Sequence, residues 1–235
     1  MTVDPFAAIA RVIGSQLGPE ACRAQLSLYV ALGDSFTAGT GCAPGDAWPE
    51  RLATGLRTSN PKLELRNLAV EGATSGEVLA QLREAIELEP DLVTIVCGAN
   101  DVLRTTRPDA HAYARRLASI FGRLHDANPV VRIVTATAPQ RWDFLDLGPR
   151  TRARVERGVA RINRATRAVA DAYGVPCLEV AGHPGLSEGE NFCADGLHPS
   201  ALGHARAARG FAELIRESYG IAITTQGGAD DHQRA

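Results

Sequence analysis

Short apolar runs alternate with longer amphipathic stretches along most of this chain. The apolar runs are rich in valine, isoleucine and leucine, and the run at 92–97 shows no polar alternation, which is typical of an internal strand in a parallel sheet. The sequence predicts five strands, at 28–33, 63–69, 92–97, 131–136 and 175–180.

The amphipathic stretches place apolar residues three or four positions apart, which is the spacing of one helical face. They predict helices at 48–56, 75–88, 109–128, 150–173 and 200–219, together with a short helix at about 4–17 that precedes the first strand. Regular alternation of strand and helix with short connections favours an α/β fold, in which helices cover both faces of a parallel sheet.

The chain has 235 residues, which is enough for one large core. We therefore expect a single domain over 1–223. Residues 224–235 are polar and contain a Gly-Gly pair, and we expect them to form a disordered tail. The net charge of −2 gives no indication of a nucleic acid or an anionic membrane as partner.

The five cysteines, Cys22, Cys42, Cys97, Cys177 and Cys193, are odd in number and include no CxxC pair. Reduced thiols in a cytoplasmic protein are the simplest interpretation, and the amino terminus has no pattern of a secretory signal. A secreted mature form remains the alternative. No apolar stretch has the length of a transmembrane helix, so we expect no stable membrane insertion.

Candidate catalytic residues follow four of the predicted strands. Ser35 comes directly after the first strand, Gly72 after the second, and Asn100 after the third, while Asp195 and His198 lie in the loop after the fifth. Because parallel strands end at one edge of a sheet, which is where ligands bind in open α/β folds, these residues are expected to converge.

This set of residues matches the needs of acyl transfer. A serine hydroxyl such as that of Ser35 is a weak nucleophile until a base, here His198, removes its proton. Asp195 would orient the histidine ring and stabilise its charged form. The amide N–H groups of Ser35 and Gly72, with the side chain of Asn100, would form an oxyanion hole for the attacked carbonyl oxygen.

Four sequence blocks in this order resemble the GDSL esterases and lipases, also called SGNH hydrolases. The blocks are Gly33-Asp34-Ser35, Gly72, Gly98-Ala99-Asn100-Asp101 and Asp195-x-x-His198. The resemblance implies a three-layer, flavodoxin-like α/β/α fold with a five-stranded parallel sheet, and a Ser/His/Asp triad. It also implies ester hydrolysis that needs no metal or other cofactor. The departure from the family pattern is Phe36, where the family name has leucine.

A second serine motif competes with Ser35. The segment 185–189 reads Gly-Leu-Ser-Glu-Gly and matches GxSxG, the nucleophile elbow of α/β-hydrolases. That motif has meaning only between a strand and a helix, whereas Ser187 lies in a glycine- and proline-rich loop. We therefore reject Ser187 as the nucleophile.

The substrate is less well defined than the reaction. Loops near the predicted site supply Trp48, Trp142 and Phe144 as candidates for a substrate pocket. A small-molecule ester with a short to medium acyl chain is the leading expectation. A carbohydrate deacetylase, an acyltransferase or a non-catalytic binding module on the same scaffold remain alternatives, and the sequence gives no oligomeric state.

Overall fold

The structure of this chain is a computed structural model that describes residues 25–223. The predicted helix at 4–17 and the predicted tail at 224–235 lie outside these residues. The remaining predicted elements fall within them.

The sheet has five parallel strands in the order β2-β1-β3-β4-β5. This is the order of flavodoxin-like folds. The all-parallel α/β sheet expected from the sequence is therefore confirmed. The strands are β1 (Leu28–Gly33), β2 (Glu64–Asn67), β3 (Leu92–Val96), β4 (Arg132–Ala136) and β5 (Cys177–Leu178).

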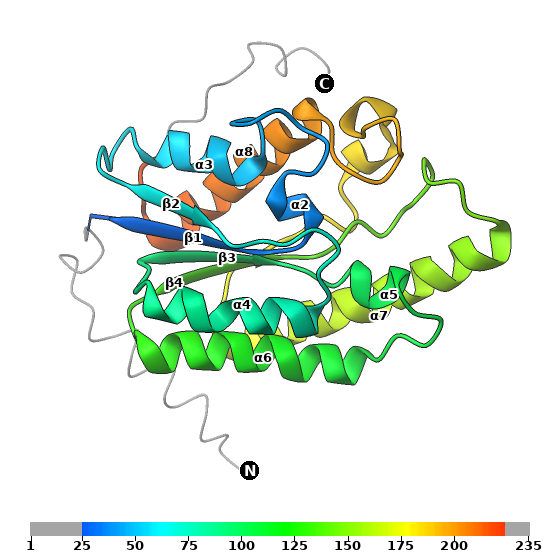
Figure 1. The fold of residues 1–235 in the computed structure, drawn as a ribbon, viewed down its shortest axis with the longest axis horizontal. Helices are drawn as coiled ribbons and strands as arrows, with labels where there is room; N and C mark the ends of the chain where they lie inside the picture. The colour runs from blue at the N-terminus through cyan, green and yellow to red at the C-terminus, as the bar shows by residue number, and fades with distance from the viewer. Residues whose placement is uncertain (1–24, 224–235) are drawn as a thin grey trace.

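Helices cover the sheet on both faces and make three layers (Figure 1). On one face lie α3 (Trp48–Leu56) and α8 (Ala201–Tyr219). On the other face lie α4 (Ser75–Glu87), α6 (Ala110–Ala127) and α7 (Pro149–Tyr173).

The alternation of side chains along each strand divides the core into two parts. In β1, Val30 and Leu32 pack toward α4, α6 and α7, whereas Tyr29 and Ala31 pack toward α3 and α8. All four are fully buried, because an internal parallel strand has helices on both sides. The apolar run in the sequence follows directly from this double burial.

Two strands are shorter than expected. β5 covers only Cys177–Leu178 rather than 175–180, and β2 covers Glu64–Asn67 rather than 63–69. At β5 the reason is a side chain, because the Thr137 hydroxyl accepts the amide N–H groups of Val180 and Ala181, each at 2.9 Å. These amides are then unavailable for a regular strand ladder.

Short helices also occur where the sequence predicted only loops. They are α2 (Ser35–Ala38), α5 (Asn100–Leu103), and the 3₁₀ turns η2 (Pro184–Ser187) and η3 (Gly189–Asn191). A helix of one turn is too short to show a periodic apolar face, so the pattern cannot indicate it.

Candidate active site

The carboxyl end of β1 is fixed by contacts that leave no freedom at Gly33. Its N–H donates to Oε1 of Gln81 at 3.0 Å, and its carbonyl accepts from Nε2 of the same side chain at 2.9 Å. A Cβ atom at Gly33 would lie 2.6 Å from the carbonyl oxygen of Val96, so no larger residue fits. Ser35 follows two residues later as the first residue of α2 and is 5% exposed.

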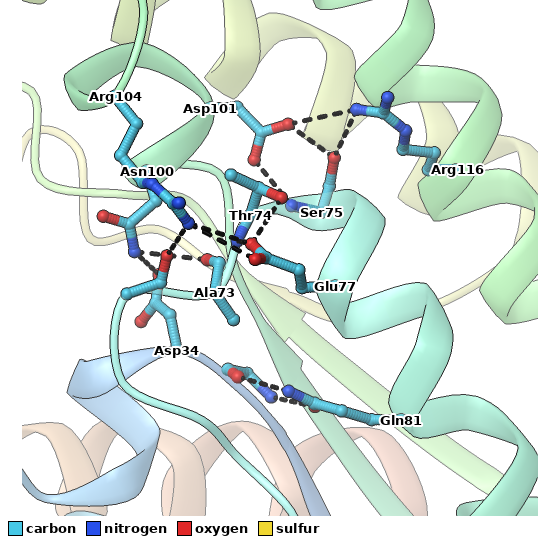
Figure 2. Close-up of polar contacts among 12 residues, drawn as sticks. Asp34, Ala73, Thr74, Ser75, Glu77, Gln81, Asn100, Asp101, Arg104 and Arg116 are labelled. Atoms are coloured by element: carbon cyan, nitrogen blue, oxygen red, sulfur yellow. Dashed lines mark hydrogen bonds and ion pairs between the residues drawn. The ribbon is translucent and has the colours of Figure 1, made fainter.

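Asp34 links β1 to the nucleophile candidate. Its Oδ1 accepts the N–H of Phe36 at 3.1 Å, which caps α2, and its Oδ2 accepts from Nδ2 of Asn100 at 3.4 Å (Figure 2). The side chain is 1% exposed. Burial raises the pKa of Asp34 from 3.8 to about 7, against the opposing effects of the Phe36 N–H and of His198, and the charge of Asp101 adds to the rise.

The raised pKa of Asp34 predicts a stability effect. The native state binds this proton more tightly than the unfolded chain, so the stabilisation is complete below about pH 4 and is lost as pH rises through about 7. The loss amounts to about 4 kcal/mol at pH 8. Asp34→Asn should therefore melt higher than the wild type at pH 8, by about 10 °C, and close to it at pH 4. Thermal unfolding at the two pH values measures this, and an equal change at both would contradict it.

The turn after β2 presents the backbone of Gly72. Its φ of +74° lies in the left-handed region that favours glycine. Arg104 holds the carbonyl side of this turn, because its Nη1 donates to the Gly72 oxygen at 2.9 Å and to Glu77 at 3.1 Å (Figure 2). Glu77 in turn accepts the N–H of Thr74 at 2.7 Å and closes a capping box at the start of α4.

Asn100 spans the ends of the first three strands. It begins α5, and its Nδ2 donates to the carbonyl oxygen of Ala73 at 3.2 Å as well as to Asp34. Asp101 ties α5 to α4 by accepting the N–H of Ser75 at 2.7 Å and its hydroxyl at 2.5 Å. The structure thus places Asn100 beside the turns that carry Ser35 and Gly72.

Two backbone amides at this edge have no acceptor. Within residues 25–223, neither the N–H of Ser35 nor that of Gly72 donates a hydrogen bond to another group. Unpaired N–H groups at the end of a parallel sheet suit an incoming anion or a carbonyl oxygen that develops charge.

Asp195 and His198 form a close pair in the loop before α8. Nδ1 of His198 lies 2.6 Å from Oδ2 of Asp195, while Oδ1 of Asp195 accepts the N–H groups of Leu197 and His198 at 2.9 and 3.0 Å. Partial burial alone would raise the pKa of Asp195, but the hydrogen bonds from His198 and Leu197 outweigh it and hold the pKa below its usual value. The carboxylate therefore orients the ring as a charged acceptor.

The histidine lies beside the segment that carries Ser35. Its ring centroid is 6.1 Å from that of Phe36, the residue that follows Ser35. Among the described residues, no hydrogen bond joins the Ser35 hydroxyl to His198. Such bonds between catalytic groups are often long before a substrate binds.

Ser187 does not lie between a buried strand and an α-helix. It is exposed and ends the 3₁₀ turn η2, with a second 3₁₀ turn following it rather than an α-helix. The strand–turn–helix arrangement that GxSxG requires is therefore not found at this position.

The three aromatic candidates for a substrate pocket lie in different places. Trp48 lines a cavity of about 180 Å³ near the site and stacks on Phe211 at 4.3 Å between ring centroids. Phe144 does not line the cavity itself, but its ring centroid lies 5.2 Å from that of Phe192, which does. Trp142 is 3% exposed, packs in the core on the α4, α6 and α7 side, and does not line this cavity.

Gln81 and Arg104 were not indicated by the sequence pattern. Gln81 offers a signal in retrospect, because it lies next to Leu82 and three residues after Val78 on the buried side of α4, where a polar residue needs a partner. Arg104 is exposed, and nothing in its sequence position distinguishes it from the other arginines.

Residues 25–223 contain no cluster of three or more His, Cys, Asp or Glu side chains suited to hold a metal ion. Over the same range no helix has the length and apolar character needed to cross a bilayer.

Known proteins resemble this chain both in sequence and in three-dimensional structure. Residues 31–206 match the model of the GDSL-like lipase/acylhydrolase family. An arylesterase from Vibrio mimicus is 28% identical over 128 residues, which cover 52% of this chain and 63% of the relative. This chain thus aligns with less than two thirds of that relative's length.

Solved structures share the fold at low sequence identity. A lipase/acylhydrolase from Enterococcus faecalis matches with a TM-score of 0.66 and 21% identity, covering 86% of this chain and 99% of the other. The esterase EstA from a Pseudoalteromonas species matches with a TM-score of 0.65 and 19% identity, covering 81% and 97%. Since the family model covers most of the chain and its blocks lie at one sheet edge, the chain belongs to the GDSL-like lipase/acylhydrolase family.

Proposed function

We propose that this protein is a serine hydrolase that cleaves carboxylic esters of small molecules through an acyl-enzyme on Ser35. The observation that carries the proposal is the pair of unpaired N–H groups at Ser35 and Gly72, which lie at the same sheet edge as the Asp195–His198 pair. Membership of an esterase and lipase family supports the same class of reaction.

In the acylation step, Nε2 of His198 takes the proton of the Ser35 hydroxyl while Oγ attacks the ester carbonyl carbon. The carbonyl π electrons move to the oxygen, which the N–H groups of Ser35 and Gly72 stabilise. Asp195 stabilises the imidazolium. When the carbonyl re-forms, the bond to the alkoxide breaks, and His198 returns the proton to the leaving alcohol.

In the deacylation step, His198 removes a proton from water, and the resulting hydroxyl attacks the acyl carbon. The same N–H groups hold the second oxyanion. The bond to Oγ then breaks, Ser35 regains its proton from His198, and the carboxylic acid leaves. No metal or other cofactor takes part in this scheme.

Asn100 would supply the third hydrogen-bond donor to the oxyanion by exchanging one of its two present hydrogen-bond acceptors. Its Nδ2 bond to Asp34 is 3.4 Å long, at the outer limit of a hydrogen bond, whereas the bond to Ala73 is shorter. We propose that the hydrogen directed at Asp34 turns to the oxyanion when the substrate binds. Asp34 positions the Asn100 amide before the substrate binds, and the Ala73 carbonyl continues to hold it afterwards.

Hydrolysis of p-nitrophenyl esters with and without EDTA tests the proposed function. We expect turnover above the uncatalysed rate, unchanged by the chelator. Activity that is lost with EDTA and restored by a metal would overturn the metal-independent scheme, and the absence of turnover on esters of any chain length would overturn the esterase itself.

Arg104 offers a test of the Gly72 turn. Arg104→Met removes the donor that holds the Gly72 carbonyl, so the N–H on the other side of the turn is less well fixed. We expect kcat to fall by about tenfold, part of the factor of about 10²–10³ that one oxyanion donor supplies, with little change in KM. Arg107→Met is the matched control, since Arg107 is exposed and its side chain makes no hydrogen bond within 25–223. Equal kcat values for the two variants would contradict this role.

A further inference from the structure

A cavity of about 180 Å³ lies on the α8 side of the sheet, where β3, β4 and β5 end. Ala136 and Leu178, which belong to β4 and β5, form its sheet side, and Ala207 and Gly210 of α8 face them. Leu186 of η2 belongs to its outer wall. The cavity therefore lies between a strand layer and a helix layer, with a loop segment as cover.

This cavity reaches the proposed site. Its lining includes Asp34 and Phe36, the two residues that flank Ser35, and Pro199, which follows His198. An acyl group attached to Ser35 would thus have the cavity immediately beside it.

The cavity offers little to a polar ligand. Its lining is largely apolar, and several of its polar side chains are already paired with one another or with backbone. Arg206 pairs with Glu188 and donates to Asn191 at 2.8 Å, and the Thr137 hydroxyl accepts the N–H of Val180. A sugar ring would leave its hydroxyls unsatisfied here, whereas a hydrocarbon chain needs no partners.

We propose that this cavity receives the acyl chain of the ester substrate and sets a preference for chains of about six to eight carbons, because a cavity of ~150 Å³ holds a benzene ring. The inference rests on the proposed function and narrows it to medium-chain acyl esters. Acetate esters, as a deacetylase would use, leave the cavity empty.

A chain-length series of p-nitrophenyl esters from acetate to dodecanoate measures the preference. Each methylene that enters an apolar cavity should raise kcat/KM by about fourfold, until the chain fills it. We expect a maximum at hexanoate or octanoate and a fall beyond decanoate. A maximum at acetate would overturn the proposal while leaving the esterase intact, and no hydrolysis at any length would overturn the proposed function itself.

Ala207→Leu tests the site of the preference. The larger side chain would occupy the cavity, so kcat/KM for octanoate should fall by more than about tenfold, the loss of two methylenes or more, while acetate is cleaved at the wild-type rate. Ala205→Leu is the matched control, because Ala205 is half-buried on the same helix but does not line the cavity. Equal losses in the two variants, or equal losses on acetate and octanoate, would contradict the assignment.

Leu178→Ala makes the opposite change, because it enlarges the cavity. It keeps the proposal testable even if Ala207→Leu fails to fold. It removes part of the cavity wall, so the longest accepted chain should lengthen by about two carbons, because the substitution removes about three carbon atoms from the lining. Octanoate itself should inhibit cleavage of the acetate ester by the wild type competitively. If the optimum does not move and octanoate does not compete with acetate ester, the acyl chain does not bind in this cavity.

Discussion

Ser35→Ala is expected to reduce ester hydrolysis by about five to six orders of magnitude, as the loss of a nucleophilic serine does in other triads. The substitution removes the oxygen that forms the acyl bond and leaves the Asp195–His198 pair in place. Because the Ser35 hydroxyl makes no hydrogen bond within 25–223, the fold should keep its stability. Steady-state rates on a p-nitrophenyl ester, with thermal unfolding alongside, measure both effects.

Ser187→Ala is the matched control for that experiment. The side chain of Ser187 is exposed in η2, so its removal should change neither rate nor stability. If Ser187→Ala abolished activity and Ser35→Ala preserved it, the site described here would be misassigned.

Asp195→Asn is expected to lower kcat by up to about 10⁴-fold with little change in stability. The Asp195 carboxylate accepts from Nδ1 of His198, which leaves Nε2 free to act as a base. An asparagine amide can donate to Nδ1 and favour the wrong tautomer. Its carbonyl oxygen can still accept the N–H groups of Leu197 and His198, so the loop should keep its conformation.

The matched control is Asp143→Asn, which alters an exposed pair with Arg141 in the neighbouring loop and should leave kcat unchanged. An Asp195→Asn enzyme with wild-type kcat would reduce Asp195 to a structural residue of the loop.

The layered fold could be predicted from the sequence because the central strands β1 and β3 are largely apolar on both faces. The run at 92–97 became β3, and the five strands formed one parallel sheet. Parallel strands end at a common edge, and this geometry alone brings Ser35, Gly72 and Asn100 together. Asp195 and His198 are three residues apart, so their pairing is a local contact that the sequence also indicates.

Contacts between elements distant in sequence could not be predicted. The bond from Arg104 to the Gly72 carbonyl and the two bonds from Gln81 to Gly33 depend on how α5 and α4 dock on the sheet. The burial of Trp142 likewise depends on which side of the sheet its loop packs against. Periodicity indicates which face of a helix is apolar, but it carries no information on these tertiary partners.

The sequence predicts that Asp34 caps the turn after β1, and the structure adds its contact with Asn100. Its position beside Ser35 suggests catalysis, yet its side chain caps α2 and contacts Asn100. A buried carboxyl whose pKa rises to about 7 is an energetic cost to the folded state above neutral pH. Such costs are common where a residue positions a functional group.

Covalent labelling by a fluorophosphonate, read out by intact mass and peptide mapping, tests the role of Ser35 most directly. We expect one label per chain, on the peptide that contains Ser35, absent in Ser35→Ala and retained in Ser187→Ala. A label on Ser187, or ester hydrolysis by a protein that takes no label at Ser35, would contradict the acyl-enzyme mechanism.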